Sequence, residues 1–150
     1  MAKPIPLGRR VGFDYGDKRI GVATSDRESI LVSPHLTLLN DDKIEIKLKE
    51  IILEFDPIYI VVGNPKHLSG SLSQTSQSVL EFASLIKSFF SRPIYLLDER
   101  FSTILSNRKL REVGITEREG KTIIDQIAAI GILESAIENE RSNRSIGDLI

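Results

Sequence analysis

The chain has no cysteine, so its 150 residues can form neither a disulfide bridge nor a thiolate metal site. It also lacks any apolar run close to the roughly 20 residues that a membrane-spanning helix needs. The first ten residues, MAKPIPLGRR, lack the apolar core of a signal peptide. Together these absences favour a cytoplasmic protein without a membrane segment.

The chain also has little net charge and few aromatic residues. The formal net charge is −1, so binding to a polyanion would need a local basic face. No aromatic cluster indicates a platform for base stacking. The length suits one domain with its own core. We therefore expect residues 1–150 to form a single domain, with a core at about 10–138 and a polar tail at 141–150.

Hydrophobic periodicity predicts three strands, followed by helices that alternate with two further strands. The expected strands are 11–14, 19–25, 30–38, 58–62 and 94–97, and Pro34 favours an edge or a bend for the third. The expected helices are 44–55, 79–90, 102–114 and 124–132, with a charged loop at 116–121 and a frayed end after residue 140. The order β-β-β-α-β-α-β-α-α predicts an α/β fold, with one mixed five-stranded sheet and helices on both faces.

Acidic residues stand at positions where a metal site could form. Asp14 ends the first strand, where we expect burial, and a buried acid is costly without a partner. Sites in such sheets form at the carboxyl ends of strands, where Gly63 and the pair Asp98–Glu99 also fall. Carboxylates from separate elements, with Asp125 of the last helix as a third, can hold two divalent cations about 4 Å apart. Such a pair of cations can cut a phosphodiester.

Each acid also has a structural alternative. Successive strand residues point to opposite faces, so only one of Asp98 and Glu99 can face Asp14. Asp14 could instead bind the amides of the following turn, and Asp125 could stabilise the first turn of the last helix. The small residues Ala128–Ala129, one turn beyond Asp125, would let that helix approach the sheet.

Basic residues near these acids are candidates for contacts with a phosphate backbone. Arg19 either contacts a phosphate or pairs with Asp17, and the loop that contains Lys66 either approaches a phosphate or only connects a strand to a helix. The candidate nucleic-acid-binding residues are Arg19, Lys66, Arg100, Arg108, Lys109 and Arg111. Further members of a basic face could be Arg9, Arg10, Arg118 and Lys121.

Four sequence blocks, in order along residues 10–138, resemble the YqgF/RuvX family of the ribonuclease H-like superfamily. They are DYGDKRIGVA at 14–23, VVGNP at 61–65 with Gly70, DERFST at 98–103, and DQIAAIGIL at 125–133. The family is related to the Holliday junction resolvase RuvC and is associated with pre-16S rRNA processing. The resemblance implies a ribonuclease H-like fold and a site for Mg²⁺ or Mn²⁺ formed by Asp14, Glu99 and Asp125. It also favours Glu99 over Asp98.

The resemblance implies a metal-dependent endonuclease that acts on structured nucleic acid, with pre-16S rRNA processing as the expected role. The alternatives are a Holliday junction resolvase-like nuclease acting on branched DNA and a non-catalytic RNA- or ribosome-binding module. A phosphate loop of an actin-like ATPase is disfavoured, because those proteins need a second domain. A junction resolvase would need two sites and therefore a dimer, whereas the sequence leaves monomer and homodimer open.

Overall fold

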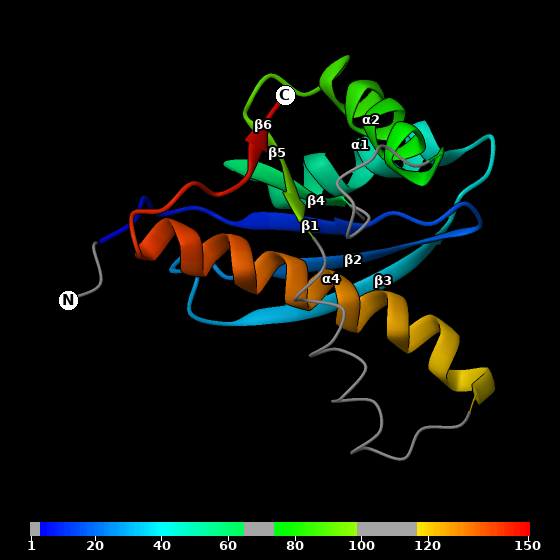
Figure 1. Cartoon of the computed structure of the whole chain (residues 1–150), viewed down its shortest axis with the longest axis horizontal. Coiled ribbons are helices and arrows are strands. Elements are labelled where there is room, and N and C mark those ends of the chain that lie inside the picture. Colours follow the sequence, from blue (N-terminus) through cyan, green and yellow to red (C-terminus); the bar gives the residue numbers. More distant parts are fainter. Residues whose placement is uncertain (1–3, 65–73, 99–116) are drawn as a thin grey trace.

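The computed structural model describes residues 4–64, 74–98 and 117–150. The strands are β1 (Arg10–Asp14), β2 (Arg19–Ser25), β3 (Val32–Leu39), β4 (Tyr59–Asn64), β5 (Ile94–Asp98) and β6 (Asp148–Leu149). The helices are α1 (Ile44–Phe55), α2 (Gln74–Lys87) and α4 (Glu117–Arg141). One sheet has the order β3-β2-β1-β4-β5-β6, with α1 and α2 on one face and α4 on the other (Figure 1). The predicted α/β class, the mixed sheet and the coverage of both faces are confirmed.

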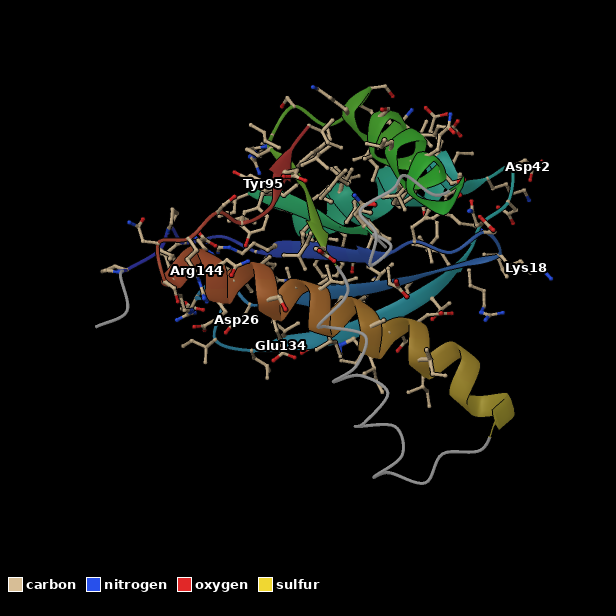
Figure 2. All side chains as sticks on the ribbon, viewed as in Figure 1. Lys18, Asp26, Asp42, Tyr95, Glu134 and Arg144 are labelled. Carbon is tan, nitrogen blue, oxygen red and sulfur yellow. The ribbon has the colours of Figure 1, made fainter. Side chains whose placement is uncertain are left out.

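The pairing of the strands gives the sheet a polar end. β1 pairs antiparallel with β2 and parallel with β4, and β4 pairs parallel with β5. The last residues of β1, β4 and β5 therefore lie at one end of the sheet, which we call the carboxyl edge. Figure 2 shows Lys18, in the β1–β2 turn, at this end of the molecule, while Asp26 and Arg144 lie at the opposite end. Ligand sites in sheets of this kind form at the carboxyl edge.

Alternate residues of the central strands build two hydrophobic cores, one on each face. The core beneath α1 and α2 includes Phe13, Val62 and Ile86, and the core beneath α4 includes Val61 and Leu133, all fully buried. Burial of such side chains contributes about 1.5–3 kcal/mol each. The unbroken apolar run of β4 is thus explained by coverage on both faces.

Helix α4 packs closely on β1 and β2 because two glycines face it. A Cβ on Gly12 would lie 2.9 Å from Leu133 Cβ, and a Cβ on Gly21 would lie 1.9 Å from the carbonyl oxygen of Asp125. Ala129 is fully buried at this contact. The prediction that small residues let the last helix approach the sheet is confirmed for Ala129, and the approach brings Asp125 against β2.

The edge strand β3 has the irregularity that its proline predicts. β3 lies at the end of the strand order, and its pairing with β2 shifts in register between Val22 and Ala23, opposite Pro34. Proline lacks the N–H that an interior strand would need, so an edge position is the tolerated one.

The loop expected at 116–121 is a wrong prediction, because α4 already begins at Glu117. The sequence there is rich in glutamate, arginine and lysine, which are good helix formers, and charge alone does not separate a loop from a solvated helical turn. The helix expected at 102–114 lies outside the described residues. Among the helices that the structure describes, none combines the length and the hydropathy of a membrane-spanning segment.

The tail expected to fray is also a wrong prediction, because it ends in β6. This strand pairs antiparallel with β5, so the sheet has six strands instead of five. The N–H of Ile150 donates to the carbonyl of Ile94 at 3.0 Å. Gly147 permits the approach, because a Cβ there would lie 2.4 Å from the Leu96 carbonyl oxygen. The pairing covers an edge of β5 that would otherwise be left open.

Candidate functional site

Asp14 is the last residue of β1 and lies at the carboxyl edge. It is half-buried, whereas the four residues before it are buried, so the acid stands at the rim of the core and not at its most buried point. Its neighbour two positions earlier, Gly12, faces α4. Because strand residues two apart share a face, Asp14 lies on the α4 face of the sheet.

Asp125 reaches the same face from α4. The residue paired with Asp14 across the ladder is Gly21, and the backbone of Asp125 packs directly on Gly21. Asp14 and Asp125 thus flank one glycine at the same end of the sheet. The next helical residue, Gln126, donates from its Nε2 to Thr37 Oγ1 of β3 at 3.1 Å, which helps to hold this part of α4 over the sheet.

Arg19 forms an ion pair with Asp125 and therefore lies close to the acidic residues of the carboxyl edge. Its Nε donates to Asp125 Oδ2 at 2.9 Å, with exposed fractions of 36% for the arginine side chain and 17% for the aspartate. The predicted alternative in which Arg19 pairs with Asp17 is therefore wrong. β2 begins at Arg19, two residues before Gly21, so the arginine is on the α4 face and can reach over the glycine. Asp17 lies outside this geometry, because it is in the exposed turn.

The alternative role of Asp125 as a helix-capping acid is wrong as well. Because α4 begins at Glu117, Asp125 lies more than two turns inside the helix. The stabilisation of acids by a helix N-terminus falls off within the first turn. The position of Asp125 is instead explained by its contact with β2 and by its ion pair with Arg19.

Asp98 and Glu99 were alternatives for a third acid. Leu97 packs in the core beneath α4 and Leu96 in the core beneath α1 and α2, so strand alternation directs Asp98 to the α1 and α2 face, away from Asp14. In the described ranges, no three acidic or histidine side chains gather closely enough to hold a metal ion, and that holds for the set of Asp14, Asp98 and Asp125. Glu99 lies outside the described residues.

Asn64, the last residue of β4, is a site feature that the sequence reasoning missed. It is only 7% exposed, and within the described part of the chain its Oδ1 has no hydrogen-bond partner. Its Cα partner on β5 is Asp98. The signal in the sequence is a polar residue that follows an unbroken apolar strand and directly precedes Pro65.

Most of the predicted basic residues lie where the structure says nothing of their side chains. Lys66, Arg100, Arg108, Lys109 and Arg111 are outside the described residues, and the side chains of Arg118 and Lys121 are not described either.

Arg10 is not part of a basic face, which corrects that prediction. It is fully buried at the other end of β1, where its Nη2 and Nε bind the carboxylate of Glu140 at 2.8 and 3.1 Å. Its Nη1 donates to Ser29 Oγ at 2.6 Å, and its guanidinium lies 5.3 Å from the ring centre of Tyr59. The Tyr59 hydroxyl donates to Glu140 Oε1 at 3.0 Å. We call Arg10, Ser29, Tyr59 and Glu140 the Arg10 cluster.

Comparison with protein families and curated proteins gives consistent matches. A family model described as RuvX, Holliday junction resolvase, matches residues 8–139. A relative from Streptomyces coelicolor is 38% identical over 145 residues, covering 94% of this chain and 87% of the relative. One from Mycolicibacterium smegmatis is 35% identical over 141 residues, covering 90% of this chain and 83% of the relative. Both carry the name "Putative pre-16S rRNA nuclease".

Solved structures agree on the fold. RuvC from T. thermophilus, solved in complex with a Holliday junction substrate, has a TM-score of 0.61 to this chain at 12% sequence identity, covering 95% of this chain and 99% of that one. At this identity the likeness concerns the fold alone. It confirms the RuvC-like, ribonuclease H-like class that the sequence blocks implied.

Proposed function

Because the chain belongs to the RuvX family, we propose that it is a metal-dependent endonuclease that cuts structured nucleic acid at the carboxyl edge of its sheet. The observation that carries the proposal is the placement of Asp14 and Asp125 on one face, on either side of Gly21. The family match and the nuclease names of the relatives support phosphodiester hydrolysis as the reaction. The chain is thus a phosphodiester hydrolase in this proposal, and its compartment is the cytoplasm.

The side chains at this edge suit a hard divalent cation. Mg²⁺ and Mn²⁺ prefer oxygen ligands, and Asp14 and Asp125 supply two carboxylates at the same end of the sheet. Glu99 is the third proposed ligand. The resemblance to the family favours Glu99 over Asp98, whose side chain is directed to the other face. Cations bound there would supply a water of lowered pKa and would neutralise charge on the phosphate.

Arg19 has two tasks in this proposal. Its Nε orients the Asp125 carboxylate, and its side chain is exposed enough for the rest of the guanidinium to meet a substrate phosphate. The planar arginine fork matches phosphate oxygens well. The further proposed contacts with the nucleic-acid backbone are Lys66, Arg100, Arg108, Lys109 and Arg111.

Pre-16S rRNA is the substrate that the relatives' names favour. The description of the family model favours branched DNA as the second candidate. Because cutting a junction symmetrically needs two active sites, this second candidate requires a homodimer, whereas the first allows a monomer. Solution mass, measured with and without a four-way junction, separates the two.

Replacement of Asp14 tests the proposal directly. We expect Asp14→Asn to lower cleavage of structured RNA by about 1,000-fold or more, because losing a metal ligand removes several kcal/mol of transition-state stabilisation. Without metal the variant should be as stable as the wild type or more stable, because repulsion between neighbouring carboxylates is relieved. The measurements are cleavage rates with Mg²⁺, with Mn²⁺ and with chelator, and thermal unfolding in metal-free buffer.

Asp17→Asn is the matched control, because it removes the same charge from the exposed turn three residues later. It should cut at nearly the wild-type rate. A fully active Asp14→Asn protein would overturn the nuclease assignment of this edge. If the wild type binds structured RNA but never cuts it under any metal condition, the non-catalytic binding module is the correct function.

A further inference from the structure

Asn64 has a buried oxygen whose partner is missing from the described part of the chain. Only 7% of Asn64 is exposed, and its Oδ1 accepts no hydrogen bond from the described residues. Buried polar groups in native proteins are nearly always paired, because leaving one unpaired is costly. An exception of this kind calls for a physical reason.

The other buried polar side chains of the described residues behave differently. Arg10, Ser25 and Ser29 are as buried as Asn64 or more so, and all three are hydrogen-bonded. Arg10 binds Glu140 and Ser29, and Ser25 Oγ accepts from the Arg10 N–H and donates to the Asp26 carbonyl. All of these lie at the end of the sheet opposite to Asn64. Among the described residues, the unpaired oxygen therefore lies at the carboxyl edge, and the buried polar groups at the other end are paired.

The position of Asn64 places it next to the candidate active site. β4 lies between β1 and β5, so Asn64 ends the strand between those that carry Asp14 and Asp98. Phe13 pairs with Val62, which puts Asn64 one residue beyond the level of Asp14 on the neighbouring strand. Neighbouring strands are about 4.8 Å apart. Asn64 shares its face with Asp98, whereas Asp14 lies on the α4 face.

The chemistry of an amide oxygen narrows the possible partners. The amide oxygen is a hydrogen-bond acceptor, so a phosphate oxygen cannot be its partner. Its partner must be a cation or an O–H or N–H donor. Two carboxylates on the neighbouring strands favour positive charge at this edge. Direct coordination by both Asp14 and Asn64 is disfavoured because their side chains leave opposite faces. A water bound to the cation extends the reach by one hydrogen bond of about 2.8 Å, and Mg²⁺ keeps several such waters.

We propose that Asn64 Oδ1 accepts a hydrogen bond from a water coordinated to the divalent cation at the carboxyl edge, which makes Asn64 a cation-positioning residue. This inference rests on the proposed function. It adds to the acidic cation ligands a residue that holds one of the cation's waters. It explains why a buried amide persists at a place where leucine would fill the same space without an unpaired oxygen.

The test has two measurements on the full chain. Isothermal calorimetry monitors a titration with Mn²⁺ alone, and thermal unfolding is recorded in metal-free buffer. We expect Asn64→Leu to raise the metal-free Tm by about 2–4 °C, because it removes an unpaired buried group. The same variant should bind Mn²⁺ about 10-fold more weakly, which is typical for loss of an outer-shell partner. Asn64→Asp should lower the metal-free Tm and show a larger Tm gain on Mn²⁺ addition, because it adds a charge that the cation satisfies.

Asn40→Leu is the matched control. Asn40 lies at the same end of the molecule, but its Nδ2 donates to the Gly16 carbonyl at 3.0 Å. Its replacement should lower the Tm, because a hydrogen bond is lost, and should leave the affinity for Mn²⁺ unchanged.

Three results would overturn the inference. One is a lower metal-free Tm for Asn64→Leu, since its oxygen would then be paired within the protein. Another is unchanged Mn²⁺ affinity in both Asn64 variants. The third is an Asn64→Leu protein that binds Mn²⁺ like the wild type and still cuts DNA but no longer cuts RNA, which would assign the Asn64 oxygen to an RNA hydroxyl. If Asp14→Asn binds Mn²⁺ as tightly as the wild type, the proposed function itself fails. If Asp14→Asn loses Mn²⁺ binding while both Asn64 variants keep it, the proposed function stands and only the role of Asn64 is overturned.

Discussion

The two ends of the sheet treat buried polar groups in opposite ways. At the amino end of β1, the guanidinium of Arg10 is fully buried and binds Glu140, Ser29 and nearby carbonyls. At the carboxyl edge, the buried amide of Asn64 has an oxygen without a partner in the described residues. One end completes its hydrogen bonds from within the chain. The other presents acceptors and half-buried acids at a place where a ligand can bind.

Helix α4 connects these two ends. Arg19 binds Asp125 in the first half of the helix, and Arg10 binds Glu140 near its last residue. The two ion pairs thus hold the same helix against the sheet at two places. The comparison teaches that the Arg10 cluster serves architecture, whereas at the carboxyl edge the Asn64 oxygen, unpaired among the described residues, is left for a cation or substrate to complete. A buried unpaired group costs about 1–3 kcal/mol, which is a sizeable fraction of the stability of a domain.

After that of Asp14→Asn, the largest expected effect distinguishes Glu99 from Asp98. Glu99→Gln should lower the cleavage rate by at least about 100-fold, because the carboxylate is a proposed cation ligand. Asp98→Asn should have a much smaller effect on the rate, because strand alternation directs Asp98 to the other face. Single-turnover cleavage rates at saturating Mg²⁺ measure both.

The reverse pattern would contradict the face assignment at the carboxyl edge. Asp98 would then share the face of Asp14, because a shift of one residue along β5 moves every side chain to the other face. Equal losses in both variants would show that the edge uses acids from both faces.

The next effect concerns the Arg10 cluster and should appear in stability. Arg10→Met leaves the Glu140 carboxylate without its buried partner, which is expected to destabilise the fold by about 3–5 kcal/mol. The metal affinity of the folded fraction should change far less than in Asp14→Asn. Urea unfolding and Mn²⁺ titration measure the two quantities.

The double variant Arg10→Met with Glu140→Leu is the control for this result. Replacement of both partners by apolar side chains removes the uncompensated charge, so much of the lost stability should return. If the double variant is no more stable than Arg10→Met, the cluster's other contacts, and not the ion pair, hold this end of the sheet.

The same comparison shows what the sequence could and could not predict. The strand ends, and Asp14 with them, follow from local patterns, because an apolar run that stops at an acid and a glycine turn is readable without tertiary contacts. The partners of Arg19 and Arg10 were not readable, because Asp125 and Glu140 are brought to them by α4 across long stretches of chain. For the same reason β6 was missed: two residues form a strand there only because β5 offers an edge. Asn64 was passed over because its burial, and not its type, makes it notable.

A smaller effect is expected from the basic residues that the structure does not describe. Neutralising Arg108, Lys109 and Arg111 together should weaken binding to all structured nucleic acids alike, because phosphate contacts position a substrate without reading bases. The wild-type slope of log affinity against log salt should be about 3–5 in magnitude, and the triple variant should lower it by up to about 3.

The control for this prediction uses exposed arginines at the opposite end. Replacing Arg27 and Arg144 with glutamine should leave the salt slope almost unchanged, because both are exposed and lie away from the carboxyl edge. Figure 2 shows Arg144 at that opposite end, and the carbonyl of Arg27 accepts from the N–H of Gly8, just before β1 begins. Binding that does not depend on salt, or a triple variant that loses affinity for one sequence alone, would argue for a protein partner instead.

The smallest effect concerns the pH dependence of the Arg10 cluster. Burial, and then the charge of Glu140, raises the pKa of Tyr59 above its ordinary value of 10.0. From about pH 10 upward, the unfolded chain releases this proton while the folded chain keeps it. The folded state then binds more protons than the unfolded state, so the contribution of Tyr59 to stability is full below pH 10 and falls as the pH rises. At pH 11 the loss should be about 1 kcal/mol.

Tyr59→Phe isolates this contribution, because it leaves every other titrating group in place. At pH 7 the variant should be less stable by about 0.5–1.5 kcal/mol, since it lacks the hydrogen bond to Glu140. Between pH 9 and 11 the difference between the two proteins should shrink, because only the wild type loses the Tyr59 contribution. Urea unfolding at each pH measures it. A difference that stays constant over this range would mean that Tyr59 ionises alike in the folded and unfolded chains. The cluster would then be open to water, and it would no longer differ from the carboxyl edge in the way its burial implies.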